Sequence, residues 1–221
     1  STLIIQAGNP ITKRSDVGIQ SVFGERFGFV ISPAESALRF YTEFSNPVKD
    51  VYSWNKSLPS SRDAFLAGDL AVYFGFASEV LELRDGNPNL NFDVALLPQS
   101  RDTDIKTTFG NMTAFAISHQ SDNVSGAFRA ANAFSGDDGA SILSQITGLP
   151  PATRSLLSER PTDARLSVFY DSALISKAWL DPDEVETEVL FGEMVDGVVS
   201  GRTRLGEAVN IVQDNLDRLL Q

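Results

Sequence analysis

Residues 64–75 read AFLAGDLAVYFG, and the prediction of the fold starts from this stretch. A short helix is expected from Arg62 to Ala67, closed by Gly68, because glycine readily takes the left-handed conformation at a helix end. The apolar run from Leu70 to Phe74 predicts a buried strand, which Gly75 ends. A helix that leads directly into a strand indicates an α/β architecture.

On the N-terminal side, Ser32-Pro33-Ala34-Glu35 is a capping box that predicts a helix ending at Asn46-Pro47. Leu3-Ile4-Ile5 is expected to be the end of an element that starts further upstream. Residues 13–29 have no clear period and are expected to form a loop with a short strand.

On the C-terminal side, a helix is expected from Ser78 to Arg84, followed by a turn at residues 85–88. Two further strands are expected, at Phe92–Leu97 and Met112–Ile117. Helices are then expected over residues 124–134, 142–146, 156–175, 184–198 and 203–220. In the helix that follows Asp181-Pro182-Asp183-Glu184, the inward side chains are expected to be Val185, Val189, Met194 and Val198. The order of elements predicts a mixed sheet flanked by helices, with a helical C-terminus.

The composition argues against several classes of function. The formal net charge of −11 would repel a phosphate backbone, so no nucleic-acid partner is expected. Cysteine is absent and His119 is the single histidine, so neither a metal centre nor a Ser-His-Asp triad is expected. His119 itself is expected to be a solvated loop residue. No GxSxG, GxxxxGK[ST] or GxGxxG motif occurs, and no apolar run reaches the roughly 20 residues that a spanning helix needs.

Several motifs together resemble the family 1 extracellular solute-binding proteins, the maltodextrin-binding relatives that serve ABC importers. That family has a helix ending in AFxxGxxAM, and here Val72 replaces the methionine. The similar segments, in order, are Ala64–Gly75, Asn87–Pro98, Phe109–Ser118, Gly126–Phe134, Gly148–Pro151 and Ser200–Arg202. The resemblance covers roughly residues 32–221.

The resemblance implies a periplasmic-binding-protein-like type II lobe and no enzymatic activity. Residues 1–108 and 155–221 would be the C-terminal lobe, and 109–154 a return segment that belongs to the N-terminal lobe in the family. The apolar face of that segment would be poorly covered unless it docks locally or two chains pair. The family also implies an extracytoplasmic location, ABC permease subunits as partners, and contact with the membrane only through the permease or a lipid anchor. No cofactor is implied.

The resemblance and the residue types together indicate a carbohydrate-like ligand, a mono- or oligosaccharide bound in the cleft between lobes. Aromatic rings stack on sugar faces, and neutral polar groups bond sugar hydroxyls. The candidate ligand-binding residues are Trp54, Asn55, Phe74, Gly75, Phe76, Ser78, Asn111 and Trp179. Each tryptophan equally fits a place at the edge of the core, Phe74 a core position, and Asn111 a strand cap. Gln6 and Asn9 are weaker candidates because their segment resembles a QxGG stretch of the family.

Two other functions remain open at this stage. A carbohydrate-active enzyme domain would need paired carboxylates, and the acidic residues at positions 181, 183, 184, 186 and 188 supply them. The start of a helix explains the same residues, because its dipole stabilises negative charge. An effector-sensing domain of a regulator would need an attached DNA-binding module, which this sequence lacks.

Overall fold

The computed structural model describes residues 1–16, 18–100 and 105–221, which form two compact units. Unit 1 consists of residues 1–58, 99–109 and 177–221, and unit 2 of residues 59–98 and 110–176. Each unit is therefore assembled from segments that are far apart in the sequence. The predicted assignment of residues 1–108, 109–154 and 155–221 to lobes of a larger protein stays a prediction.

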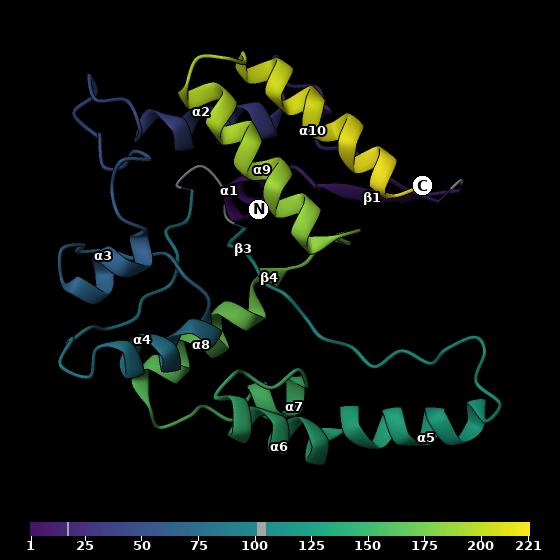
Figure 1. Cartoon of the computed structure of the whole chain (residues 1–221). Coiled ribbons are helices and arrows are strands. Elements are labelled where there is room, and N and C mark those ends of the chain that lie inside the picture. Colours follow the sequence, from purple (N-terminus) through teal and green to yellow (C-terminus); the bar gives the residue numbers. More distant parts are fainter. Residues whose placement is uncertain (17, 101–104) are drawn as a thin grey trace. The chain divides into compact units, whose positions relative to one another are not determined.

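Unit 1 is built on three helices that pack together, α2, α9 and α10 (Figure 1). Its elements are α1 (Thr2–Gln6), β1 (Thr12–Ser15), β2 (Gly18–Ser21), α2 (Pro33–Glu43), β3 (Thr108–Phe109), α9 (Glu184–Val199) and α10 (Leu205–Leu219). Strands β1 and β2 are antiparallel, with Thr12 opposite Ser21 and Ser15 opposite Gly18. The hairpin confirms the short strand expected between residues 13 and 29.

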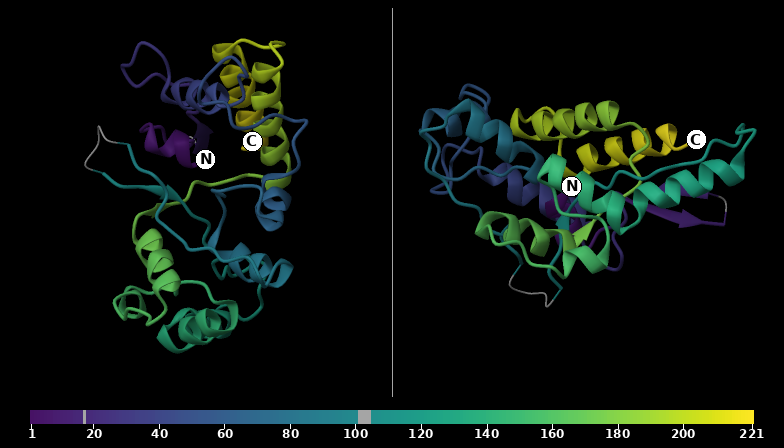
Figure 2. Two further views of the ribbon diagram at one scale, coloured as in Figure 1. Left: turned by 90° about the vertical axis from the view of Figure 1, so that its left-hand side faces the viewer. Right: turned by 90° about the horizontal axis from the view of Figure 1, so that it is seen from below.

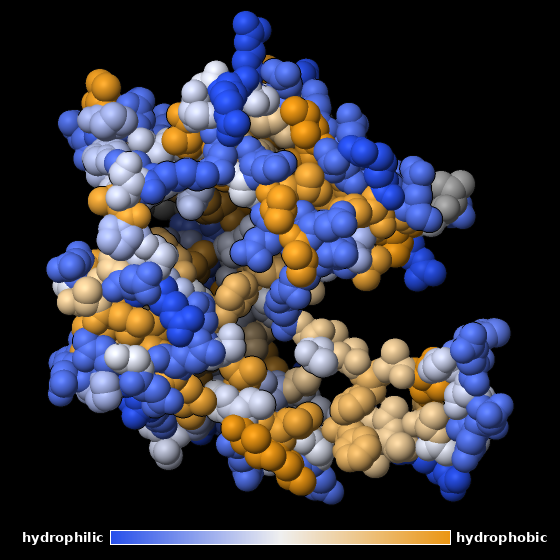
Figure 3. Space-filling view, in the orientation of Figure 1, coloured by the Kyte–Doolittle hydropathy of each residue, from blue (hydrophilic) through white to orange (hydrophobic). Residues whose placement is uncertain are grey.

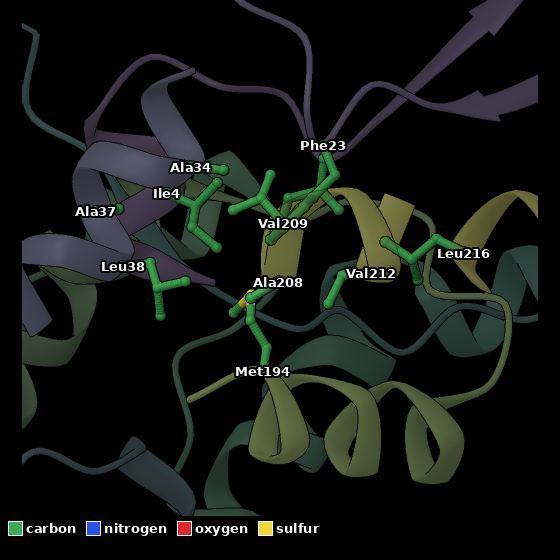
Figure 4. Close-up of a cluster of buried hydrophobic side chains, with 11 residues drawn as sticks. Ile4, Phe23, Ala34, Ala37, Leu38, Met194, Ala208, Val209, Val212 and Leu216 are labelled. Carbon is green, nitrogen blue, oxygen red and sulfur yellow. The ribbon is translucent and has the colours of Figure 1, made fainter. Parts of the chain in front are cut away.

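The core of unit 1 lies where α2, α9 and α10 meet α1 and the segment that follows β2 (Figure 4). Its buried side chains are Ile4, Ile11, Phe23, Ala34, Ala37, Leu38, Met194, Ala208, Val209, Val212 and Leu216. On α2 and α10 these residues recur at helical spacing, as the sequence predicts. On α9 only the second half of the prediction holds, since Met194 is buried and Val198 packs on the core. Val185 and Val189 are exposed because they lie on another face of α9 than Thr187, Met194 and Val198.

Unit 2 consists mainly of short helices (Figures 1 and 2). They are α3 (Ser61–Ala67), the 3-10 turn η1 (Ala77–Glu79), α4 (Val80–Gly86), α5 (Val124–Ser135), α6 (Asp137–Thr147), α7 (Arg154–Leu157) and α8 (Ala164–Leu174). Strand β4 (Ser176–Lys177), of which Lys177 already belongs to unit 1, pairs with β3. No helix in the described residues is long and apolar enough to cross a membrane.

Several predicted helix ends are confirmed, but α2 ends at Glu43, before the predicted Asn46-Pro47, and the helix expected over residues 156–175 is two helices, α7 and α8. The Ser32 hydroxyl accepts a bond from the Glu35 amide at 3.1 Å, as the capping box predicts. Asp183 caps α9 by accepting from the amides of Val185 and Glu186 at 3.1 and 3.0 Å. Gly68 and Gly148 end α3 and α6 with φ of +82° and +68°. Such conformations are costly for residues with a Cβ, which explains glycine at both positions.

The three strands predicted at Leu70–Phe74, Phe92–Leu97 and Met112–Ile117 are wrong. None of these segments forms a strand, and the sheets in the described residues have two strands each rather than forming one mixed sheet. The segments are also not buried, since Val72, Leu96, Met112 and Phe115 are all exposed. A strand requires a neighbouring strand to pair its backbone hydrogen bonds, and the described residues place no strand beside these segments.

Candidate ligand-binding site

The loop that carries Trp54 is tied to the end of α2. The amides of Ser53 and Trp54 both donate to the carbonyl of Phe44, at 2.8 and 3.3 Å. The Trp54 ring lies 5.2 Å from the ring of Tyr41 and is tilted by 34° to it. The indole Nε1 of Trp54 is buried and has no hydrogen-bond partner among the described residues. Burial also raises the pKa of Tyr41, so its phenol is neutral at ordinary pH.

Asn55 stabilises the same loop. Its Nδ2 bonds the hydroxyl of Tyr52, and its Oδ1 accepts from the Ser57 amide at 2.7 Å. The neighbouring Lys56 forms an ion pair with Asp196 on α9. The loop of residues 52–57 is therefore fixed at one end by its bonds to Phe44 and at the other by the ion pair of Lys56. These contacts give Trp54 a defined position although it lies in a loop.

Trp179 lies against the core of unit 1. Its ring stacks on that of Phe191 at 6.3 Å, and Phe191 in turn lies 5.5 Å from the ring of Phe23. Its indole N–H donates to the Ser1 hydroxyl at 3.3 Å. The ring is only partly buried. It covers a core edge, one of the two roles that the sequence leaves open, and its part in ligand binding stays a prediction.

Phe74, Gly75, Phe76 and Ser78 lie together in unit 2, just before and within the turn η1. Phe74 is 64% exposed and Phe76 is 51% exposed, so Phe74 is not a core residue. Ser78 is exposed as well. Two aromatic rings facing solvent on either side of a glycine form an open apolar surface of the kind on which flat ligands stack.

The remaining polar candidates lie in different surroundings. Asn111 is exposed and caps no strand, because no strand follows it. Gln6 donates to the Thr107 carbonyl at 3.1 Å, and the buried Asn9 donates to the Phe23 carbonyl at 2.8 Å. Gln6 and Asn9 thus connect segments within unit 1. His119 is exposed in a turn, as expected.

The acidic group serves the start of α9. Asp183 caps the helix, and Asp181 accepts from the Thr187 hydroxyl at 2.7 Å and from the Asp183 amide at 3.2 Å. These contacts support the helix-start explanation of the acidic residues over paired catalytic carboxylates. In the described part of the chain, no group of His, Asp or Glu side chains is arranged to hold a metal ion.

The structure brings the candidates together only in part. Trp54, Asn55 and Trp179 belong to unit 1, while Phe74, Gly75, Phe76, Ser78 and Asn111 belong to unit 2. Shallow hollows lie elsewhere, one beside Gly24 and Gln213 in unit 1 and one beside Phe92 and Arg165 in unit 2.

Three residues that were not predicted from the sequence lie beside the candidates: Tyr41, Tyr73 and Glu79. Tyr41 lies on α2 and contacts the Trp54 ring. Tyr73 and Glu79 bond each other at 2.6 Å across Gly75. A glutamate three residues after Phe76 sits at the spacing of a capping box, but Phe76 has no hydroxyl to complete that signature.

Comparisons with known proteins identify the fold. No family model and no curated protein sequence matches the chain. Among solved structures, an ABC transporter solute-binding protein from Thermotoga lettingae TMO, bound with alpha-D-tagatose, matches 100% of this chain with a TM-score of 0.57 and 18% identity. The maltose-maltodextrin binding protein of Alicyclobacillus acidocaldarius matches 97% of this chain with a TM-score of 0.65 and 14% identity.

The chain spans only 55% and 57% of the length of those two proteins. At these identities the likeness concerns the fold, and it extends along nearly the whole chain in both cases. The chain therefore has the fold of a portion of a periplasmic-binding-protein-like solute-binding protein, as the sequence motifs predict.

Proposed function

We propose that this chain is part of the substrate-binding component of an ABC importer and binds a carbohydrate-like solute without chemical conversion. The observation that carries the proposal is the structural match, over 97% or more of the chain, to two proteins whose names state that they bind tagatose and maltose-maltodextrin. The exposed aromatic rings described above supply the kind of surface that a sugar requires. Delivery to a membrane permease and an extracytoplasmic location are parts of the same proposal.

In this proposal the ligand lies in a cleft between two lobes, and Trp54 is the main stacking residue contributed by unit 1. The Trp54 loop is anchored to α2 and by the Lys56–Asp196 ion pair, so little ordering of the loop is needed when the ligand binds. Asn55 is the polar candidate of unit 1, while unit 2 by itself has Phe74 and Phe76 as stacking candidates and Ser78 and Asn111 as polar candidates. Trp179 is retained as a second stacking candidate.

The test is a saccharide titration of two single-tryptophan variants, Trp54→Phe and Trp179→Phe. Because the chain has two tryptophans, each variant leaves one emitter. We expect a saturable emission change at up to millimolar sugar in Trp179→Phe, where Trp54 is the emitter. Calorimetry of Trp54→Ala should show at least a tenfold weaker affinity, about 1.4 kcal/mol. Glycerol at equal concentration is the control for non-specific effects.

A flat calorimetric response of the folded wild-type chain to all mono- and oligosaccharides tested would contradict the proposal. A saturable change seen only in Trp54→Phe would assign the stacking role to Trp179 instead. The two variants therefore test the ligand class and the stacking residue separately.

We also propose that residues 109–154 form a return segment that packs on the N-terminal lobe of a two-lobed protein. Its support is the apolar surface over α5, α6 and the segment leading into α5 (Figure 3). The exposed side chains are Met112, Phe115, Val124, Phe128, Phe134, Ile142, Leu143 and Ile146. A contiguous apolar surface of this kind marks an interaction site.

Light scattering of the chain measures its oligomeric state, and binding of a hydrophobic dye measures its exposed apolar surface. Together they test this assignment. We expect a monomer that binds the dye, with less dye bound by Phe128→Asp. Phe29→Asp in unit 1 is the matched control, because Phe29 and Phe128 are both 62% exposed. A stable dimer that Phe128→Asp dissociates would show that copies of the chain cover this face instead, and a monomer without dye binding would contradict an open face.

A further inference from the structure

Residues 73–79 of unit 2 form a closed network around one carboxylate. The Tyr73 hydroxyl donates to Glu79 Oε1 at 2.6 Å, and the Phe76 amide donates to Glu79 Oε2 at 2.5 Å. The two oxygens of Glu79 thus hold the chain on both sides of Gly75. We call Tyr73, Gly75 and Glu79 the aromatic-loop clamp.

Gly75 is required by this geometry. A Cβ at position 75 would lie 2.6 Å from Glu79 Oε2 and 2.6 Å from the Tyr73 ring, well inside normal contact distance. A side chain there would force the ring or the carboxylate away from the loop. Glycine therefore allows the clamp to close over the backbone.

The clamp is anchored to the rest of unit 2 through aromatic packing. The Tyr73 ring stacks on Phe65 of α3 at 5.5 Å with an angle of 27° between the ring planes. Phe65 also contacts Phe92 edge-on at 5.6 Å. The Tyr73 ring is held against α3, Tyr73 holds the Glu79 carboxylate, and Glu79 in turn fixes the backbone of Phe76.

The loop needs such support because residues 72–76 belong to no helix or strand. Phe74 is 64% exposed and Phe76 is 51% exposed, so both residues present apolar surface to solvent. Without the clamp, the loop would have to be ordered by the ligand, and that entropic cost would reduce affinity.

We propose that Tyr73 and Glu79 are positioning residues that fix the backbone of Phe74, Gly75 and Phe76 so that the two phenylalanine rings form a prearranged stacking surface for a saccharide. This inference rests on the proposed function, because a saccharide is the ligand that the rings would meet. Neither Tyr73 nor Glu79 needs to touch the ligand.

The protonation state of Tyr73 is consistent with this role. Burial, the hydrogen bond to Glu79 and the negative charge of Glu79 raise the pKa of Tyr73 to about 12, while the positive charge of Arg62 acts in the opposite direction. The phenol therefore remains a donor at neutral pH. Deprotonation at higher pH would put two negative charges together and open the clamp.

The experiment uses Glu79→Gln and Tyr73→Phe in the full 221-residue chain, with Asp85→Asn on α4, the helix that follows η1, as the matched control. We expect the Phe76 amide to exchange its hydrogen at least tenfold faster in both clamp variants. In ultraviolet titrations, the tyrosine that ionises at about pH 12 in the wild type should shift towards 10 in Glu79→Gln. Saccharide affinity should fall about three- to tenfold, with Asp85→Asn unchanged in every measurement.

The first two measurements need no ligand, so they test the clamp separately from the proposed function. Unchanged exchange and an unchanged tyrosine titration in Glu79→Gln would overturn the clamp. Faster exchange with unchanged affinity would overturn the positioning role. If the wild-type chain binds no saccharide, the proposed function fails and the ligand role of the clamp fails with it, whatever the exchange data show.

Discussion

Replacing Phe23 by alanine is expected to lower the free energy of unfolding of unit 1 by about 3–5 kcal/mol. The Phe23 side chain is 0% exposed and lies in the core among α1, α2, α9 and α10. Its ring contacts Phe191 at 5.5 Å, so the substitution also leaves Phe191 facing a cavity. Urea unfolding followed by tryptophan emission measures the effect, because both tryptophans belong to unit 1.

The matched control is Phe29→Ala in the same unit. Phe29 is 62% exposed, and its truncation is expected to change stability by less than about 0.5 kcal/mol. Equal losses of stability in the two variants would contradict the placement of Phe23 in the core.

A methyl group at Gly139 is expected to destabilise the contact between α5 and α6 by about 1–3 kcal/mol. A Cβ at this position would lie 2.2 Å from the carbonyl oxygen of Phe134 and 2.7 Å from its carbonyl carbon. Backbone atoms cannot rotate away as a flexible side chain can, so one helix must shift. Because unit 2 contains no tryptophan, the measurement is amide hydrogen exchange across α5 and α6.

Gly192→Ala is the control for helix propensity. Gly192 lies within α9, and a Cβ there would meet nothing within 4 Å. Alanine should stabilise α9 by up to about 1 kcal/mol, since glycine is the weaker helix former. If both glycine substitutions stabilise the chain, the close approach of α5 and α6 at Gly139 is contradicted.

Candidate ligand-binding residues could be predicted from the sequence only where the residue type and the adjacent residues together indicate binding. Trp54 stands out because it is a large aromatic residue in a polar loop, and the structure places it there, packed on Tyr41. Phe74 and Phe76 were found through the family motif. Glu79 was missed because its partners are a tyrosine hydroxyl and a backbone amide, and their meeting depends on how the chain turns at Gly75.

Most of the helices and several of their ends could be predicted from the sequence, but the interruption between α7 and α8 could not. Ser32, Gly68, Gly148 and Asp183 each act on the backbone of their own turn, within a few residues, so the signal and its effect lie in the same short stretch. The apolar faces of α2 and α10 follow from the same local periodicity.

Only the tertiary structure decided which apolar segments form strands and which side chains are covered. Leu70–Phe74 and Met112–Ile117 have strand-like composition, yet neither pairs with a strand in the described chain. Pairing depends on backbone partners that are distant in sequence, and burial depends on what packs above a face. This is why α9 buries Met194 but exposes Val185 and Val189, although all three are apolar residues of one helix.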